Sequence, residues 1–327
     1  MSAVAEHLAL GRAAFLWACG LDVAVRKPGN VSHASPGHGM QAEQFLVSAH
    51  AAVGPLFACG QPVGARIEAA VAATRAAVGC NTNLGILLLC APLAAALERS
   101  AGNSPVALQA ACRAVLATLD VADARAAYRA IALANPGGLG RAGAQDVAAT
   151  PTVDLVAAMG LAAARDSIAR QYANGYADVF DCGLAALAVP GGRLSGAVQA
   201  AFLSFLAGWP DSHVVRKLGA APAQTVTADA GVWLGQLRAD PAAGEVAAFA
   251  AWDESLKAFG INPGTSADLT VCALFAAALS RPDVIGMRIT ERWHGLCIHT
   301  SGDGLFSTSD TGGSGFSGRS ELTSKES

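Results

Sequence analysis

Long alanine- and leucine-rich runs, cut at intervals by short polar segments, dominate this sequence of 327 residues. Hydrophobic residues make up 53% of the chain and charged residues only 14%, so most of the chain must face inward. Alanine, leucine and arginine favour helices, whereas the alternating β-branched runs that predict strands are nearly absent. We therefore expect one all-α, bundle-like domain over residues 1–299, with a polar cleft lined by loops and helix ends.

Clusters of glycine, proline and asparagine divide the apolar runs into separate helices. Such clusters mark turns, because glycine and asparagine tolerate positive φ and proline cannot continue a helix. The segments between them predict helices at 3–24, 41–58, 63–78, 84–99, 104–117, 121–134, 152–181, 196–208, 227–238, 242–259 and 265–280. The serine- and glycine-rich segment 300–327 cannot bury enough apolar area to offset its ordering entropy, so we expect a disordered tail there.

Charge, hydropathy and cysteine distribution argue against several classes of protein. The net charge of −3 gives no electrostatic reason to expect nucleic acid or an anionic membrane as a partner. The longest apolar run, Leu84 to Leu97, is too short to cross a bilayer and contains a proline. The eight cysteines form no CxxC pair and the N-terminal residues do not resemble a secretion signal, so we expect buried thiols in a cytoplasmic protein.

One glycine-rich segment matches a dinucleotide-binding fingerprint but lies in the wrong context. Residues Gly138 to Gly143 match GxGxxG, which binds pyrophosphate when it follows a β-strand and opens a helix. Here the preceding residues predict a helix and the following residues predict a loop, so we reject a Rossmann site. The sequence also contains no P-loop, HExxH or GxSxG motif.

Many of the polar side chains lie at the breaks between helices, where an apolar helical protein can hold a polar ligand. Unpaired N–H groups at helix N-termini favour phosphate, carboxylates hold metal ions, and lysine and arginine bind phosphate oxygens. This mixture of groups matches the needs of a magnesium–polyphosphate ligand. The candidate residues are Asp22, Lys27, Asn30, His38, Arg66, Asn81, Asn83, Asp166, Arg170, Asp211, His213, Arg216, Lys217 and Asp268.

Individual residues in this set also have purely structural interpretations. The segment from Lys27 to Asn30 is typical of a helix stop and turn, and one asparagine of the Asn81–Asn83 segment is a natural N-cap. Asp166 and Arg170 are four residues apart, which suits a surface ion pair worth about 0.3–0.5 kcal/mol. Each structural interpretation is the more common one when taken alone. Together they do not explain why a chain with so few charges places many of them at its breaks.

The breaks occur in the order typical of one protein family. Between Ala18 and Leu269 the chain contains ACGLDVAVRKPGNVS, GHGM, GCNTNLGI, RDSIARQYANGYADVF, PDSHVVRKLG and NPGTSADL, and in this it resembles the triphosphoribosyl-dephospho-CoA synthase family. The resemblance implies an all-helical enzyme that joins ATP to 3′-dephospho-CoA with loss of adenine, for prosthetic-group biosynthesis. GHGM without an aspartate before Met40, and NTNLG without a histidine or lysine after Thr82, are similar to a divergent branch found in archaea and in some bacteria with one-carbon metabolism.

The reaction implied by this resemblance assigns roles to the charged residues. An acceptor hydroxyl attacks C1′ of the ATP ribose while adenine leaves, so the transition state has oxocarbenium character. We expect Asp22 to be the general base, with Asp268 as second choice, and Asp166 and Asp211 to bind Mg²⁺ directly or through water. The expected phosphate contacts are Lys27, Arg66, Arg170, Arg216 and Lys217.

The uncharged polar residues and the function classes complete this expectation. His38 or His213 would assist the departing adenine, and Asn30, Asn81 and Asn83 would bind the nucleotide. Besides a triphosphoribosyl transferase, two classes stay open: an ATP-dependent enzyme with a different acceptor in one-carbon cofactor synthesis, and a non-catalytic helical nucleotide-binding protein. The low charge of the surface is compatible with a homodimer.

Overall fold

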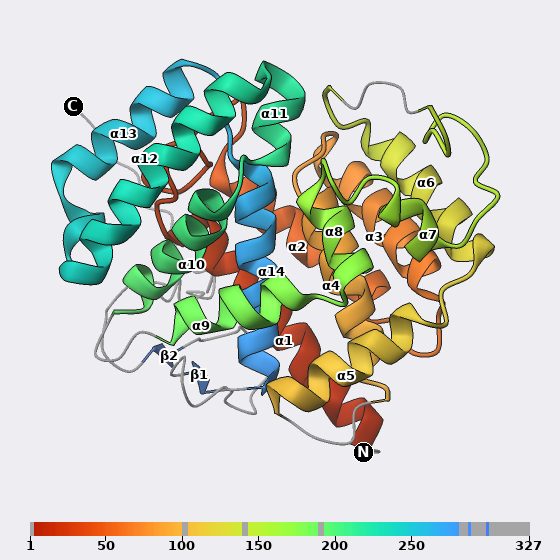
Figure 1. Ribbon diagram of the computed structural model, residues 1–327. Coiled ribbons are helices and arrows are strands. Elements are labelled where there is room, and N and C mark those ends of the chain that lie inside the picture. Colours follow the sequence, from red (N-terminus) through yellow and green to blue (C-terminus); the bar gives the residue numbers. More distant parts are fainter. Residues whose placement is uncertain are drawn as a thin grey trace, which may run out of the picture.

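Helices form nearly all the regular structure of the computed structural model, which describes residues 3–99, 104–138, 143–188 and 193–280 and the backbone of 287–288 and 299–300 (Figure 1). The predicted all-α class is therefore confirmed. The α-helices are α1 Ala3–Ala24, α2 Ala42–Leu56, α3 Val63–Val78, α4 Leu84–Ala96, α5 Pro105–Leu116, α6 Val121–Ala134, α7 Leu155–Gly160, α8 Ser167–Asn174, α9 Leu184–Leu187, α10 Leu194–Gly208, α11 Ser212–Leu218, α12 Ala220–Ala239, α13 Ala247–Ala258 and α14 Gly264–Ser280. A π-helix, η1 Asp178–Gly183, a 3-10 turn, η2 Ala243–Glu245, and the paired strands β1 Met287–Arg288 and β2 His299–Thr300 accompany them.

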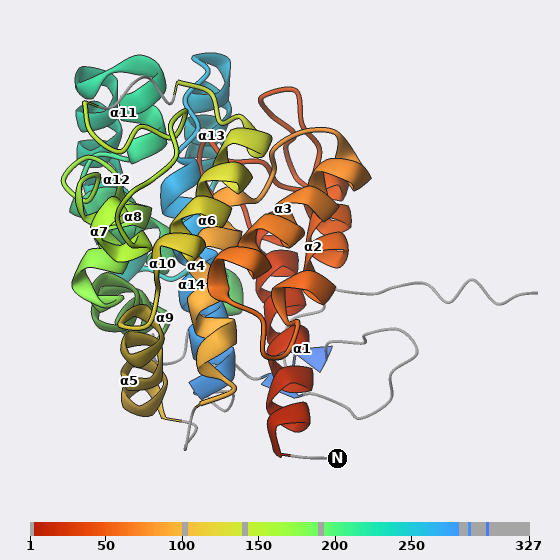
Figure 2. The same ribbon diagram turned by 90° about the vertical axis from the view of Figure 1, so that its right-hand side faces the viewer.

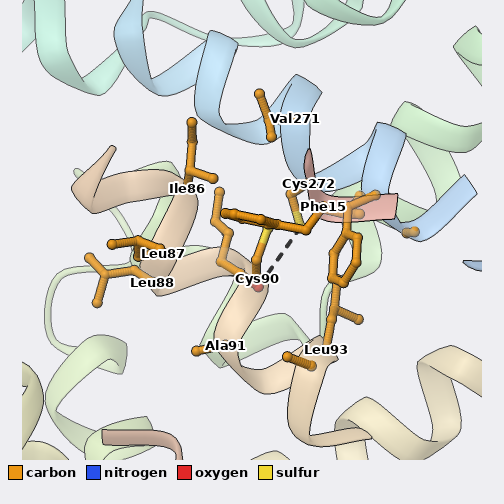
Figure 3. Close-up of a cluster of buried hydrophobic side chains, with 14 of the residues drawn as sticks. Phe15, Ile86, Leu87, Leu88, Cys90, Ala91, Leu93, Val271 and Cys272 are labelled. Carbon is orange, nitrogen blue, oxygen red and sulfur yellow. Dashed lines mark hydrogen bonds between the residues drawn. The ribbon is translucent and has the colours of Figure 1, made fainter. Parts of the chain in front are cut away.

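Helix α14 runs through the centre of the molecule because it is apolar on every side. All its residues from Leu269 to Ser280 are buried, and such a helix requires neighbours all round. Helices α1, α4 and α10 pack against it, with α12 on one side of the molecule and α3 on the other (Figure 1 and Figure 2). Figure 3 shows Phe15, Cys90 and Cys272 meeting in this core.

A proline interrupts hydrogen bonding inside α4, and one tyrosine replaces the lost donor while a second binds the next carbonyl. Pro92 has no N–H, so the carbonyl of Leu88 loses its usual partner four residues later. Tyr172 donates its hydroxyl hydrogen to that carbonyl at 2.7 Å, and Tyr176 donates to the carbonyl of Leu89 at 2.8 Å. Both tyrosines are buried, so α8 and the turn after it are fixed against α4 where the backbone of α4 needs partners.

Helices α3 and α6 approach each other closely at Gly64. The N–H of Gly64 donates to Asp123 Oδ1 at 2.7 Å, and a Cβ added to Gly64 would lie 2.5 Å from the carbonyl oxygen of Asp123. Backbone cannot move aside as a flexible side chain can. We expect Gly64→Ala to lower the free energy of unfolding by about 1–3 kcal/mol, as measured by urea denaturation.

Gly231 of α12 supplies the matched control for this prediction, because nothing lies within 4 Å of a Cβ added there. Gly231→Ala should instead stabilise the protein by about 0.5–1 kcal/mol through better helix propensity. If both substitutions change the free energy of unfolding equally, the close contact between α3 and α6 is not the reason that residue 64 must be glycine.

The predicted helix boundaries agree with the structure where the breaks are strong. The predictions for 3–24, 63–78 and 121–134 coincide with α1, α3 and α6. Because α6 and not a strand precedes Gly138, the rejection of a Rossmann site agrees with the structure.

The prediction of one continuous helix over 152–181 is wrong. The chain forms α7 and α8 there, each capped by an aspartate, and then turns through Gly175 and Tyr176, both at positive φ, before η1. Helix α11 also lies where no helix is predicted, and α12 begins at Ala220 and not at residue 227. Aspartate inside an apolar run is compatible with either an exposed helical position or a cap, and only the tertiary contacts decide between them.

The sequence also predicts that no helix spans a membrane and that the cysteines are free thiols. No single helix in the described ranges is long and apolar enough to cross a membrane, although α5 and α6, bent by 98°, reach that length and apolarity together. All seven cysteines in the described ranges are free thiols, four of them buried. Of the predicted tail, residues 301–327 lie outside the described residues.

Candidate functional site

The first residues of α8, α11 and α14 are joined by hydrogen bonds between serine and aspartate side chains. The N–H of Ser167 donates to Ser212 Oγ at 2.9 Å, which links α8 to α11. Ser266 donates its N–H and its hydroxyl to Asp211 Oδ2 at 2.7 and 2.8 Å, which links α14 to α11. Helix N-termini carry partial positive charge, so their meeting point favours an anion.

Asp268 of α14 faces the start of a fourth helix, α4. Gly85 in the first turn of α4 leaves room for its carboxylate, and a Cβ at that position would collide with Asp268 Oδ2. No hydrogen bond or ion pair within the described ranges engages Asp268, whose side chain is partly buried. A carboxylate in such surroundings without a partner is available to a ligand.

The electrostatic environment of Asp268 shows that the other candidate aspartates lie around it. Burial raises the pKa of Asp268 well above its ordinary value, because the charged form is desolvated. The pKa is raised further by the negative charges of Asp22, Asp211 and Asp166, while Arg216 opposes the shift. The fold therefore brings Asp22, Asp166 and Asp211 within electrostatic reach of Asp268, although they are distant in sequence.

The two predicted magnesium ligands, Asp166 and Asp211, are helix caps whose oxygens differ in availability. Asp211 Oδ1 accepts two N–H groups of α11 and its Oδ2 accepts both donors of Ser266, so neither oxygen lacks a partner. Burial raises the pKa of Asp211 even though these hydrogen bonds lower it. Asp166 uses only Oδ1 to cap α8, and its Oδ2 lies 3.7 Å from Arg216 Nη1. Of the two, only Asp166 keeps an oxygen for a ligand.

No group of three or more histidine, cysteine, aspartate or glutamate side chains in the described ranges is arranged to hold a metal ion. A metal ion at this place would thus depend on oxygens that a substrate brings. Mg²⁺ is commonly held in this way, through one or two carboxylates and the phosphates of a nucleotide.

Asp22 and Lys27 form a buried ion pair at the end of α1. Lys27 Nζ lies 3.0 Å from Asp22 Oδ1 and also donates to the backbone carbonyl of Asp22. The side chains are 0% and 4% exposed. Lys27 therefore neutralises Asp22, and its buried ammonium group is not exposed to a phosphate ligand. For the same reason Asp22 is a less available base than its position in the sequence predicts.

The polar segment after α1 is fastened to the residues that lead into α14. Asn30 Nδ2 donates to Asn262 Oδ1 at 3.0 Å, and His38 Nε2 donates to the carbonyl of Gly29 at 2.8 Å. Asn30 Oδ1 is buried without a partner. His38 lies in the same segment at a positive φ of 55°. Both predicted residues are thus placed next to the start of α14.

His213 is neutral in this structure. Burial lowers its pKa to about 3, and the positive charges of Arg216, Lys217 and His38 contribute. Its Nε2 is buried without a partner, and its Nδ1 would lie 2.9 Å from a Cβ on Gly264. An imidazole with this pKa cannot deliver a proton as imidazolium near pH 7, so its expected assistance to adenine is limited to a neutral hydrogen bond.

Arg170 of α8 is held flat against an aromatic ring beside the site. Its guanidinium lies 3.7 Å from the ring centroid of Trp209, and its Nε donates to Asp178 Oδ2 at 2.8 Å. Arg170 Nη2 is buried without a partner. Its ion-pair partner is Asp178, so the pairing with Asp166 suggested by their spacing does not form.

The remaining predicted cations divide into two groups. Arg216 and Lys217, at the end of α11, lie against the segment after α6, where Arg216 Nε donates to the carbonyl of Gly137 at 3.1 Å. Arg66 instead pairs with Glu98, beyond the far end of α4. Helix α4 has 13 residues, so its two ends are about 20 Å apart. The structure does not bring Arg66 to the site.

The two candidate asparagines before α4 differ in their partners. Asn81 Oδ1 accepts the N–H of Leu84 at 3.1 Å, which satisfies the start of the helix. Both polar atoms of the Asn83 side chain are buried without a partner. A buried unpaired amide costs free energy, so Asn83 gains more than Asn81 from a polar ligand.

Sequence reasoning does not single out Gly85, Ser167 or Ser212, although all three shape the site. Glycine in the first turn of an apolar helix is one available signal, because it has low helix propensity and permits close approach. The two serines offer no such signal, since their contact joins positions 45 residues apart.

The chain is similar to known proteins of one family. A family model described as ATP:dephospho-CoA triphosphoribosyl transferase (CitG) matches residues 9–286. The chain is also similar to a crystal structure from Archaeoglobus fulgidus, solved as a candidate triphosphoribosyl-dephospho-CoA synthase, with 26% sequence identity and a TM-score of 0.58. That match covers 73% of this chain and 98% of the other. No curated protein matches the sequence.

Proposed function

The chain belongs to the family of ATP:dephospho-CoA triphosphoribosyl transferases and is a transferase of the triphosphoribosyl-dephospho-CoA synthase type, and we propose that it joins the triphosphoribosyl group of ATP to a hydroxyl of 3′-dephospho-CoA with release of adenine. The acceptor is the one that the family description names, and the observation that supports the site most strongly is Asp268, which has no partner in the described ranges, at the meeting point of four helix starts. The branch with archaeal and one-carbon relatives stays a prediction.

The triphosphate would lie where the helix starts meet. The partial positive charge at the N-termini of α4, α8 and α14 favours phosphate oxygens. Arg216 and Lys217 supply full positive charge from α11, and Arg170 offers an unpaired Nη2. These groups hold the polyphosphate tail and leave C1′ of the ribose to face the acceptor.

Asp268 is the residue we assign as general base. The attacking hydroxyl must lose its proton as the bond to C1′ forms, and a base works best when its pKa lies near the working pH. The raised pKa of Asp268 makes its carboxylate a stronger base than an ordinary aspartate. The first choice made from the sequence, Asp22, is occupied by Lys27.

Mg²⁺ fits the site through Asp166, whose Oδ2 has no hydrogen bond and faces Arg216. When bound there with the triphosphate, the ion would neutralise phosphate charge. Asp211 would keep its role as the cap that joins α11 to α14.

Adenine leaves with an electron pair, so hydrogen-bond donors near the base would relieve its developing charge. Within the described ranges, the amide of Asn83 and Nε2 of His213 are buried polar groups without partners that could supply such hydrogen bonds. His38, which donates to Gly29, is engaged elsewhere.

The test is to incubate the protein with ATP, Mg²⁺ and dephospho-CoA and to measure free adenine by chromatography. We expect one adenine for each acceptor consumed, and Asp166→Asn should reduce both this rate and the Mg²⁺-dependence of ATP binding. Release only with another acceptor would favour the one-carbon cofactor enzyme. Binding of ATP without release from any acceptor would favour the non-catalytic protein.

A further inference from the structure

One buried carboxylate outside the site holds the polar segment that follows α1. Asp253 of α13 is 0% exposed and accepts the N–H of Gly29 on Oδ1 at 2.8 Å. Its Oδ2 accepts Nη1 of Arg26 at 2.5 Å, and Nζ of Lys257 lies 2.9 Å from both oxygens. The carboxylate therefore has three partners, two of them in the segment from Val25 to Met40.

Lys257 extends this attachment further along the segment. Its Nζ also donates to the carbonyl of Ser35 at 3.0 Å. Helix α13 thus holds the segment at Arg26, at Gly29 and at Ser35, and two of the three contacts are made by Asp253 itself. The segment between these points includes Asn30, which the site analysis places beside Asn262.

Gly29 transmits the position of Asp253 toward the site. The N–H of Gly29 is bound to Asp253, while its carbonyl accepts Nε2 of His38 at 2.8 Å. Gly29 has a φ of +83°, and a Cβ there would lie 2.7 Å from Pro263 Cδ and 2.8 Å from the carbonyl oxygen of Ile261. The residue is thus enclosed between α13 and the segment that leads into α14.

Because Asp253 is buried, its ionised carboxylate and the folded segment from Val25 to Met40 stabilise each other. A carboxylate without water requires hydrogen bonds and positive charge to remain ionised. Asp253 obtains them only when the segment after α1 is folded against α13, because Arg26 and Gly29 supply two of its partners. Burial in turn lowers the pKa of Lys257, and the charge of Asp253 opposes that shift.

We propose that Asp253 is a positioning residue, which fixes the segment from Val25 to Met40 so that Asn30, whose Oδ1 lacks a partner in the described ranges, lies correctly beside Asn262 at the start of α14. It touches neither the four aspartates of the site nor the helix starts, and it acts through Gly29. The inference rests on the proposed function, because its effect is read on the transfer of the triphosphoribosyl group.

The test compares Asp253→Ala with Asp253→Asn. Alanine removes both the acceptor for Gly29 and the charge, whereas asparagine keeps an oxygen that can accept the Gly29 N–H. In Asp253→Ala we expect amide hydrogen exchange in peptides covering 25–40 to be at least tenfold faster. We also expect kcat/KM for adenine release to fall about 10- to 100-fold, because small misplacements in a site are costly. Asp253→Asn should recover a large part of both losses.

Glu254→Gln is the matched control. This charge-removing substitution near Asp253 should have smaller effects, since Glu254 is 60% exposed and contacts the segment only at Arg26 and Ser35. Asp229→Asn is the neutral control: Asp229 is exposed on α12, and no hydrogen bond or ion pair in the described ranges joins it to residues 25–40, so exchange and kcat/KM should match the wild type. If Asp253→Ala does not fold, Gly29→Ala disturbs the same segment from the opposite side without changing charge, and the same two losses are expected.

The outcomes separate this inference from the function on which it rests. A folded Asp253→Ala variant with faster exchange over 25–40 but with kcat/KM within twofold of the wild type overturns the positioning role and leaves the proposed function intact. A loss of thermal stability without faster exchange over 25–40 also overturns it. A wild-type protein that releases no adenine with any acceptor refutes the proposed function, and this inference falls with it.

Discussion

Replacing Asp268 by asparagine should reduce adenine release by about 100-fold or more and at the same time make the folded protein more stable at neutral pH. The loss of rate follows from removing the proposed base without changing the volume of the side chain. The gain in stability follows from the environment of Asp268, which is desolvated and lies among three other aspartates.

The sign of the pH dependence follows from the raised pKa of Asp268. Between its ordinary value in the unfolded chain and the higher value in the folded protein, the folded state binds more protons, so stability decreases as the pH rises. Asparagine removes this decrease. The melting temperature of Asp268→Asn should therefore exceed that of the wild type above the unfolded-state pKa, and the difference should vanish below it.

Two measurements and one control check this prediction. Melting temperatures are recorded between pH 4 and pH 8, and adenine release by the wild type is followed over the same range. The rate should decline toward acid through the raised pKa of Asp268. Asp229→Asn on the exposed face of α12 should change neither quantity. If Asp268→Asn melts below the wild type at neutral pH, the carboxylate has a stabilising partner and the assigned environment is wrong.

Replacing Lys27 by methionine should cost about 3–5 kcal/mol of unfolding free energy, the largest stability effect expected in this protein. The substitution leaves the carboxylate of Asp22 charged, 4% exposed and without its cation. Desolvating an unpaired charge costs far more than the loss of one surface contact. Urea denaturation measures the change directly.

A double-mutant cycle shows whether the ion pair is the cause. Asp22→Asn combined with Lys27→Met removes both charges and should recover a large part of the loss, because no buried charge is then left unpaired. Lys217→Met is the control for stability, since this exposed lysine has no ion pair in the described ranges and should change the free energy of unfolding by less than about 0.5 kcal/mol. A Lys27→Met variant that loses under 1 kcal/mol by this measurement would show that Asp22 reaches water.

The sequence predicts the identity of many site residues but not their division of labour. Asp166, Asp211 and Asp268 all occur in the breaks before or at the start of helices, where an acidic residue is favoured by the helix dipole. Their local sequences give no reason to separate them. In the structure Asp211 joins two helices, Asp166 has an Oδ2 that lies near Arg216 without a hydrogen bond, and Asp268 has no partner in the described ranges.

Arg66 and Asp253 show the two ways in which the sequence misleads. The sequence predicts Arg66 as a phosphate contact because it is a scarce charge near a break, yet it pairs with Glu98 at the far end of α4. Nothing in the sequence of the predicted helix 242–259 indicates a role for Asp253, yet this residue binds the segment after α1, 224 residues away in sequence. Both errors arise because the partner of a buried charge is chosen by packing and not by sequence distance.

By itself the sequence determined that this chain is helical, where most helices begin and end, and that polar groups collect at those ends. These are local properties, set by propensity, by glycine and proline, and by the unpaired N–H groups of each first turn. Only the tertiary structure decided which charges neutralise each other and which are left for a substrate. Lys27 is assigned to Asp22 and Ser266 to Asp211, so Asp268 remains free. The physical reason is that the desolvation cost of a buried charge is offset by neighbouring groups that folding brings together. These neighbours come from distant parts of the chain, so no local stretch of sequence identifies them.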